Sequence, residues 1–209
     1  MRAVARDFIR HVALLLAALL CLPPALAQVP AASPPPADVR VALDTSAGRI
    51  LVAVHLAKAP VTAANFLRYV DQKRFDGTLF YRGVGSADYG FVQGGAQNDP
   101  KRVLPPIAHE PTSRTGLTHD DGALSMARYA PGSATGDFFI VLGKMPGMDA
   151  QPQAPGDNQG FAVFAHVVEG MDVVRAILAA PKSPAAGEGV MKGQMLEQPV
   201  KIISARRVP

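Results

Sequence analysis

The chain has 209 residues, a net charge of +4 and a single cysteine, and 48% of its residues are hydrophobic. This length suits one well-buried domain, and the small, scattered positive charge excludes a nucleic-acid-binding surface. A single cysteine also excludes an intrachain disulfide.

Residues 1–27 have the pattern of a secretory signal peptide. Three arginines precede an apolar run, residues 12–22, that is too short to span a bilayer comfortably. A Pro-Pro pair ends the run, and Ala25-Leu26-Ala27 offers a cleavage site before Gln28. We therefore expect export to the periplasm and no stable membrane insertion after cleavage. An uncleaved anchor helix is the alternative.

Residues 28–37 are rich in proline and alanine, and we expect them to form an extended linker. Cleavage would remove 27 of the 209 residues, including Cys21, three arginines and one aspartate. The mature chain would then have 182 residues, no cysteine and a net charge of +2. Residues 38–209 are expected to form one domain, and a monomer is the default.

The domain alternates short apolar runs with turns, which is typical of short β-strands. The expected strands are residues 39–43, 49–56, 80–82, 122–128, 137–143, 161–168 and 200–207. An apolar face at helical spacing predicts one helix over residues 63–72, with Thr62 as its N-cap, and a second over residues 171–180. Seven or eight strands with two helices predict a closed antiparallel barrel capped by helices.

Residues 79–96 carry the most informative pattern. Phe80-Tyr81-Arg82 and a later Gln93-Gly94-Gly95 flank an insert, residues 83–90, that we expect to be flexible. Strand alternation places Phe80 and Arg82 on one face and Tyr81 on the other, unless the strand is twisted or bulged. We interpret the pattern as a short apolar groove that contains one guanidinium and one carboxamide. Such a groove suits a neutral, amide-bearing ligand better than a phosphate or a metal.

Two further segments are candidate functional regions: a polar cluster at residues 119–121 and a long loop at residues 145–160. His119-Asp120-Asp121 contains metal-ligating residue types, but adjacent residues do not easily face one ion. We interpret it as a solvated turn and predict no metal site. The long loop of residues 145–160 is expected to be functional or mobile.

Five motifs, in this order, resemble the cyclophilins, a family of peptidyl-prolyl cis-trans isomerases. They are A-P-V-T-A-A-N-F (59–66), F-Y-R with F-V-Q-G-G (80–95), G-A-L-S-M-A-R (122–128), F-F-I (138–140) and F-A-V-F-A-H-V-V-E-G-M-D-V-V (161–174). The resemblance implies a mainly β fold, a closed eight-stranded antiparallel β-barrel capped by two α-helices, with the site on its outer face. It also implies isomerisation of X–Pro bonds in proline-containing polypeptides, without a cofactor.

The resemblance assigns the catalytic roles to Arg82 and Gln93. Phe139 falls on the phenylalanine of the family's proline pocket, and residues 126–128 fall on the segment whose backbone pairs with the peptide. The expected substrate-binding residues are Tyr81, Phe91, Met126, Ala127, Arg128, Asp137, Phe139, Met148 and Phe161.

The chain departs from the family pattern at several of these positions. Tyr81 stands where a histidine usually precedes the arginine, and Asp137 stands where a glutamine often precedes the F-F pair. The spacing between the two catalytic residues is longer than in the common pattern because of the insert. The aromatic wall of the pocket is therefore either Tyr89 or Phe91.

These residues suit the expected chemistry. An X–Pro bond rotates slowly because amide resonance must be broken, at a barrier of about 18–20 kcal/mol. In the twisted state the nitrogen becomes a hydrogen-bond acceptor, so a guanidinium from Arg82 would stabilise that state more than either planar one. Export predicts a role in the folding of exported proteins, in which X–Pro isomerisation is a slow step.

Two other functions stay open on the sequence. A cyclophilin-like module could bind proline-containing segments without turning them over, and it would not need Arg82. A secreted Ser-His-Asp hydrolase is the other, although no serine lies in a G-x-S-x-G motif. Its candidate residues are Ser86, Ser125, Ser133, His109, His119 and His166.

Overall fold

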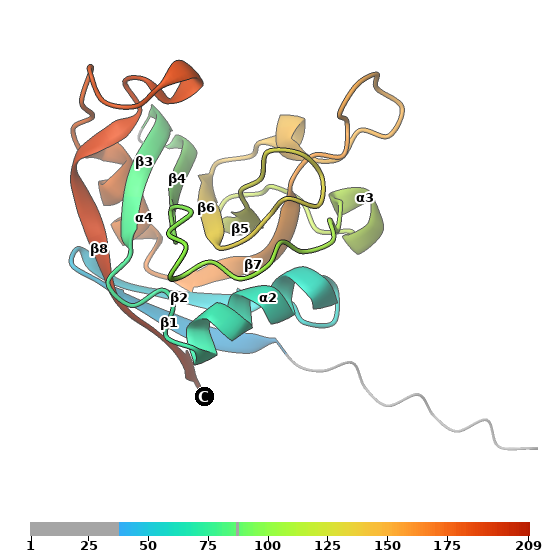
Figure 1. The fold of residues 1–209 in the computed structure, drawn as a ribbon, viewed down its shortest axis with the longest axis horizontal. Coiled ribbons are helices and arrows are strands. Elements are labelled where there is room, and N and C mark those ends of the chain that lie inside the picture. The colour runs from blue at the N-terminus through green and yellow to red at the C-terminus, as the bar shows by residue number, and fades with distance from the viewer. Residues whose placement is uncertain (1–37, 87) are drawn as a thin grey trace, which may run out of the picture. The chain divides into compact units, whose positions relative to one another are not determined.

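The chain forms a closed β-barrel. The computed structural model describes residues 38–86 and 88–209, so the predicted signal peptide (1–27) and linker (28–37) lie outside the described residues. Eight strands close in the order β1-β2-β7-β5-β6-β4-β3-β8, and all neighbouring pairs are antiparallel (Figure 1). This confirms the fold class that the sequence predicted.

The elements follow the predicted order, but the strand over residues 89–95 was not among the expected strands. The strands are β1 (Val39–Thr45), β2 (Gly48–Val54), β3 (Leu79–Ser86), β4 (Tyr89–Gly95), β5 (Ala123–Met126), β6 (Asp137–Leu142), β7 (Ala162–Glu169) and β8 (Met195–Val208). The expected helices are α2 (Pro60–Asp71) and α4 (Met171–Ala179); the single turn α3 (Thr112–Thr115) and the early start of β8 were not predicted. Within the described ranges, no helix has both the length and the apolarity to span a membrane.

An aromatic cluster fills the barrel interior. Phe138 on β6 makes edge-to-face contacts with Phe66 on α2, with Phe75 and with Phe80 on β3, at centroid distances of 5.6, 5.4 and 5.8 Å. All four rings are at most 1% exposed, so α2 closes the barrel by inserting Phe66 into it. Because side chains alternate along a strand, Phe139 must face the outside of the barrel.

Helix α2 begins earlier than predicted. Its first residue is Pro60, a position where the missing N–H is no loss, and Thr62 lies inside the first turn instead of capping it. The carboxylate of Glu110 accepts hydrogen bonds from the Thr62 hydroxyl and N–H at 2.6 and 2.7 Å, and from the Val61 N–H at 3.2 Å. A buried glutamate from a distant loop therefore caps the helix. The sequence of the helix itself does not reveal this capping residue.

The insert, residues 83–90, lengthens the β3–β4 hairpin. Gly85 pairs with Gly90 and Ser86 with Tyr89, so the prediction of a flexible insert is wrong for the residues that pair. The strands approach so closely that a Cβ on Gly85 would lie 2.1 Å from the Tyr89 carbonyl oxygen, and one on Gly90 would lie 1.9 Å from that of Val84. Both positions therefore require glycine.

Candidate functional site

A cavity of about 310 Å³ lies on the outer face of the barrel wall formed by β3, β4 and β6. Ten of the eleven predicted site residues line it. Its lining consists of Tyr81, Arg82, Phe91, Gln93, Gln97, Asn98, Ala127, Arg128, Tyr129, Ser133, Thr135, Asp137, Phe139, Met148, Phe161 and Met191.

Met126 is the exception among the predicted residues. Its side chain is 2% exposed and belongs to the hydrophobic core, and it does not line the cavity. Met126 lies on β5, opposite the interior residue Phe138. The lining of the cavity therefore gives no support to Met126 as a substrate-binding residue, and its role stays a prediction.

A bulge in β3 brings Tyr81 and Arg82 to the same cavity. Phe80 pairs with Gly94, but Arg82 pairs with Gln93, so Tyr81 is an extra residue in the strand. The extra residue breaks the alternation that the sequence predicted. Phe80 lies in the core, whereas Tyr81 and Arg82 both line the cavity.

Hydrogen bonds hold the guanidinium of Arg82 on two sides. Its Nη1 donates to Gln93 Oε1 at 2.8 Å, while Nε and Nη2 donate to Gln194 Oε1 at 2.8 and 2.6 Å. Gln93 Nε2 in turn donates to the Tyr81 hydroxyl at 2.7 Å. The guanidinium carbon lies 5.3 Å from the centre of the Phe91 ring. Arg82 is thus fixed at the edge of an apolar surface.

Burial alters the acid–base properties of this group of side chains. Burial raises the pKa of Tyr81, which therefore stays a neutral phenol. Burial lowers the pKa of Arg82, with the partial opposition of Tyr81, but an arginine guanidinium keeps its charge in proteins. The site therefore presents one partly desolvated cation beside neutral hydrogen-bonding groups.

Three phenylalanines form the apolar part of the cavity. The Phe139 ring lies 5.3 Å from that of Phe91 and 5.4 Å from that of Phe161, the latter edge to face. Tyr89 is 55% exposed and does not line the cavity, so Phe91 is the aromatic wall. These rings, with Met148 beside them, make a water-poor surface next to Arg82.

Asp137 lies at the polar end of the cavity. It is 8% exposed, and its Oδ1 accepts a hydrogen bond from the Gln97 N–H at 2.9 Å. Burial raises the pKa of its carboxyl, while backbone N–H groups of Gln97 and Asn98 oppose that effect. Its backbone carbonyl accepts from the Ala127 N–H at 2.9 Å, which fixes the adjacent segment.

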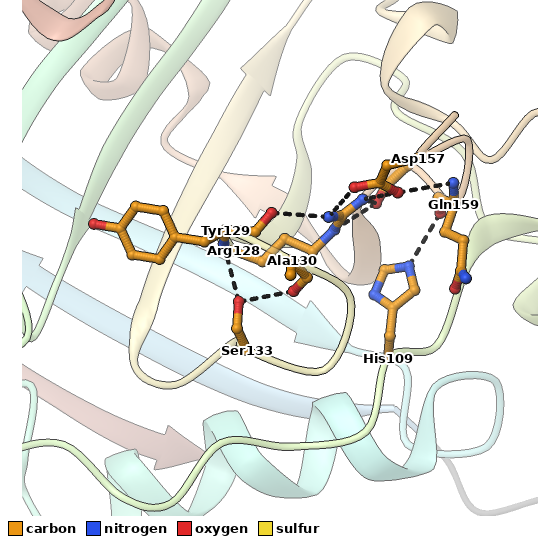
Figure 2. A network of polar contacts seen from close by, with 8 residues as sticks. His109, Arg128, Tyr129, Ala130, Ser133, Asp157 and Gln159 are labelled. Atoms are coloured by element: carbon orange, nitrogen blue, oxygen red, sulfur yellow. Dashed lines mark hydrogen bonds and ion pairs between the residues drawn. The ribbon is translucent and has the colours of Figure 1, made fainter. Parts of the chain in front are cut away.

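The side chain of Arg128 binds the loop between β6 and β7. It donates twice to Asp157, at 2.7 and 3.0 Å, and twice to the carbonyl of Gly160, at 2.8 and 2.6 Å (Figure 2). A fifth bond reaches the carbonyl of Tyr129, and the guanidinium carbon lies 5.1 Å from the centre of the Phe161 ring. Arg128 therefore ties this loop to one wall of the cavity.

His119 is buried behind the cavity instead of lying in a solvated turn. Its Nδ1 lies 2.6 Å from Asp149 Oδ1, its Nε2 lies 3.0 Å from Ser125 Oγ, and its ring stacks on Phe139. Ser125 and His119 are 0% and 1% exposed, so no substrate carbonyl can reach this Ser-His-Asp arrangement. The hydrolase alternative therefore lacks an accessible nucleophile at Ser125.

Metal-binding geometry is not observed at His119-Asp120-Asp121 or elsewhere in the described ranges. No three His, Cys, Asp or Glu residues among those in residues 38–86 and 88–209 are placed to hold one ion.

Sequence reasoning missed several residues of the site. Gln194 is the most important, because it binds Arg82 from 112 positions further along the chain. Tyr129, in a loop, and Met191, in a short 3₁₀ turn, also line the cavity, but neither belongs to a distinctive motif. No local signal in the sequence could have identified Gln194, since its segment meets β3 only in the folded barrel.

Comparisons with known proteins show what this chain is similar to. Residues 40–207 match the family described as "Cyclophilin type peptidyl-prolyl cis-trans isomerase/CLD". A peptidyl-prolyl cis-trans isomerase of Streptomyces antibioticus is 38% identical over 79% of this chain and 96% of that protein. Peptidyl-prolyl cis-trans isomerase B of Escherichia coli is 34% identical over 78% of this chain and 96% of that protein.

A solved structure supports the fold. The crystal structure of a cyclophilin-type peptidyl-prolyl cis-trans isomerase of Cryptosporidium parvum matches with a TM-score of 0.66 at 18% identity, covering 82% of this chain and 98% of that one. The family match spans most of the described residues. The alignments with the two sequence relatives each include 96% of the relative's own length. The chain therefore belongs to the cyclophilin family of peptidyl-prolyl cis-trans isomerases.

Proposed function

We propose that this chain isomerises X–Pro bonds in the cavity, with Arg82 as the catalytic group and Phe139 as the floor of the proline pocket. The observation that carries the proposal is the guanidinium of Arg82, fixed by two glutamines at the edge of a surface made by Phe91, Phe139 and Phe161. A pyrrolidine ring on that surface would place its nitrogen within reach of the cation.

The proposed chemistry needs no covalent intermediate. Rotation about the X–Pro bond removes conjugation from the nitrogen, whose lone pair then accepts a hydrogen bond. A donor fixed in advance, in a site that excludes water, stabilises that twisted state at no cost of reorganisation. Arg82 suits this role because it stays charged and its donors form a rigid fork.

Gln93 would act by orienting Arg82. Its Oε1 already accepts from the guanidinium, and its Nε2 donates to Tyr81, so its hydrogen bonds within the protein fix the carboxamide in place. These contacts support a role in positioning Arg82 more than a role in holding a substrate carbonyl.

The substrates would be proline-containing polypeptides. The Cryptosporidium parvum relative has also been crystallised in the presence of the dipeptide Ala-Pro. In this chain residues 127–129 line the cavity, and an extended peptide could lie there beside the backbone of Ala127 while Arg128 holds the neighbouring loop. Only residues close to the proline would be read.

The activity test uses residues 28–209 and a short Ala–Pro peptide. We expect the protein to accelerate cis–trans exchange, measured by NMR exchange spectroscopy, at protein concentrations far below that of the peptide. Peptide binding without acceleration would contradict the proposal and favour a module that binds proline-containing segments without turning them over.

We further propose that the chain is exported and assists the folding of periplasmic proteins as a monomer. The basic, apolar and small-residue pattern of residues 1–27, followed by the Pro/Ala linker, supports this proposal. Mass spectrometry of the protein from the periplasmic fraction should identify Gln28 as the first residue. A protein that retains Met1 and stays in the cytoplasm would contradict it.

A further inference from the structure

Gln194 is held next to Arg82 by the backbone as well as by its side chain. It lies between the 3₁₀ turn η2 (Gly189–Met191) and strand β8. Its carbonyl accepts from the N–H of Gly83, the residue after Arg82, at 3.0 Å, and its own N–H donates to the carbonyl of Met191 at 3.0 Å. The carboxamide therefore starts from a fixed point just before strand β8 and beside β3.

The contact with Arg82 has a defined polarity. Arginine only donates, so the atom that receives both Nε–H and Nη2–H must be the oxygen of the Gln194 carboxamide. Gln93 receives Nη1–H on another edge of the same guanidinium. Of the five N–H bonds, one on Nη1 and one on Nη2 are left to face the cavity.

We propose that Gln194 is a positioning residue for isomerisation: its uncharged carboxamide oxygen accepts hydrogen bonds from Arg82 and so fixes the guanidinium. This inference rests on the proposed catalytic role of Arg82. Without Gln194 only Gln93 would restrain the guanidinium by hydrogen bonds, and the long arginine side chain would regain its torsional freedom. A fixed donor is effective because no reorganisation is needed when the nitrogen becomes an acceptor.

The neutral character of the acceptor is as important as its position. A carboxylate here would accept the same two N–H bonds, but it would also compensate the charge of the guanidinium. The remaining donors would then interact more weakly with the proline nitrogen. The structure therefore favours glutamine over glutamate at this position, although both have the same length.

The inference is tested with Gln194→Ala and Gln194→Glu in residues 28–209. For Gln194→Ala we expect the exchange rate on the enzyme to fall about tenfold, as for loss of a hydrogen bond to a charged group. The dissociation constant for the Ala–Pro peptide should change less than about twofold, because Gln194 does not itself line the cavity. A wild-type exchange rate in Gln194→Ala would overturn the inference.

The NMR signal of the Arg82 Nε–H provides an independent readout. It should be protected from solvent exchange in the wild type and in Gln194→Glu, and lose protection in Gln194→Ala. Gln194→Glu should nevertheless isomerise more slowly than the wild type; equal rates would overturn the requirement for an uncharged acceptor. Unaltered protection in Gln194→Ala would show that this residue does not position Arg82.

The matched control is Gln198→Ala, an exposed glutamine on strand β8, four residues after Gln194. It should keep both the exchange rate and the Nε–H protection. Arg82→Ala is measured in parallel: if that variant keeps the wild-type rate, the catalytic role of Arg82 fails. If Arg82→Ala loses activity while Gln194→Ala does not, only the role of Gln194 fails.

Discussion

At the scale of single residues, Tyr81 shows how a departure from the family pattern can preserve the site. Its hydroxyl accepts the hydrogen bond of Gln93, whose oxygen accepts from Arg82, so three side chains form one chain of contacts. Tyr81 reaches the cavity only because of the bulge in β3. A hydroxyl here serves as the acceptor that fixes the orientation of the carboxamide.

Tyr81→Phe should therefore reduce activity without emptying the cavity. The buried N–H of Gln93 would lose its acceptor, which we expect to lower kcat/KM several-fold and the free energy of unfolding by about 1 kcal/mol. Exchange kinetics and urea unfolding check both values. Tyr89→Phe, at a 55% exposed tyrosine, is the control and should change neither. An unaltered kcat/KM in Tyr81→Phe would contradict the contribution of this contact.

At the scale of elements, side chains from outside the loop between β6 and β7 hold it in place, and Arg128 makes the most hydrogen bonds to it. Arg128 binds Asp157 and Gly160, and His109 lies 3.0 Å from the carbonyl of Gln159 (Figure 2). The loop carries Met148 and leads into Phe161, both of which line the cavity. Its attachment therefore influences the shape of the proline pocket.

Asp157→Asn should loosen this loop and leave the barrel intact. The carboxylate is 46% exposed, so its loss should cost less than about 1 kcal/mol of unfolding free energy. Limited proteolysis should cut the variant faster between residues 150 and 158. Asp88→Asn, whose carboxylate is 90% exposed and 3.7 Å from Arg175, should be cut at the wild-type rate. Equal cleavage of both variants would contradict the role of the Arg128–Asp157 contact in holding the loop.

Helix α2 depends in a similar way on Glu110. This glutamate is 1% exposed, and its carboxylate accepts three hydrogen bonds from the first turn. Glu110→Ala would leave those donors unpaired, so we expect it to lower the free energy of unfolding by about 2–3 kcal/mol. Urea unfolding measures this, with the exposed Glu169→Ala as control. Similar stability of the two variants would refute the capping role.

At the scale of the whole molecule, the buried His119 and the partly buried His166 connect stability to pH. Burial lowers the pKa of His119, although Asp149 opposes it, and burial together with the neighbouring His55 lowers the pKa of His166. The unfolded chain binds protons at these residues near pH 6.5, at about the ordinary histidine pKa. Below that pH the unfolded state holds more protons, so stability decreases as the pH falls.

The prediction is a lower free energy of unfolding at about pH 5.5 than at about pH 7.5. Part of this loss should disappear in His166→Gln, which cannot take up a proton in the unfolded state. Urea unfolding of both proteins at the two pH values measures the difference. An identical decrease in the wild type and in His166→Gln would rule out a contribution from this residue.

Much of this architecture could be predicted because strands and helices leave local patterns in the sequence, namely short apolar runs between turns and apolar residues at helical spacing. Short apolar runs predicted the barrel, and the resemblance to the cyclophilins, carried in part by the F-Y-R and F-F-I motifs, predicted that Arg82 and Phe139 belong to one site. The contributions of Gln194, Glu110 and Asp157 could not be predicted, because each acts on a segment far away in sequence. The bulge at Tyr81 also escaped prediction, since the strand pairing that creates it depends on two partner strands.

The central claim is that Arg82 stabilises the twisted X–Pro bond rather than the bound peptide. The most direct measurement compares residues 28–209 with their Arg82→Ala variant, with Arg114→Ala as an exposed control. NMR line shapes of an Ala–Pro peptide give the exchange rate on the enzyme and the dissociation constant separately. We predict that Arg82→Ala slows exchange by about 10²–10³-fold, as for loss of a preorganised donor, with little change in peptide affinity. Exchange at the wild-type rate in Arg82→Ala would contradict the account.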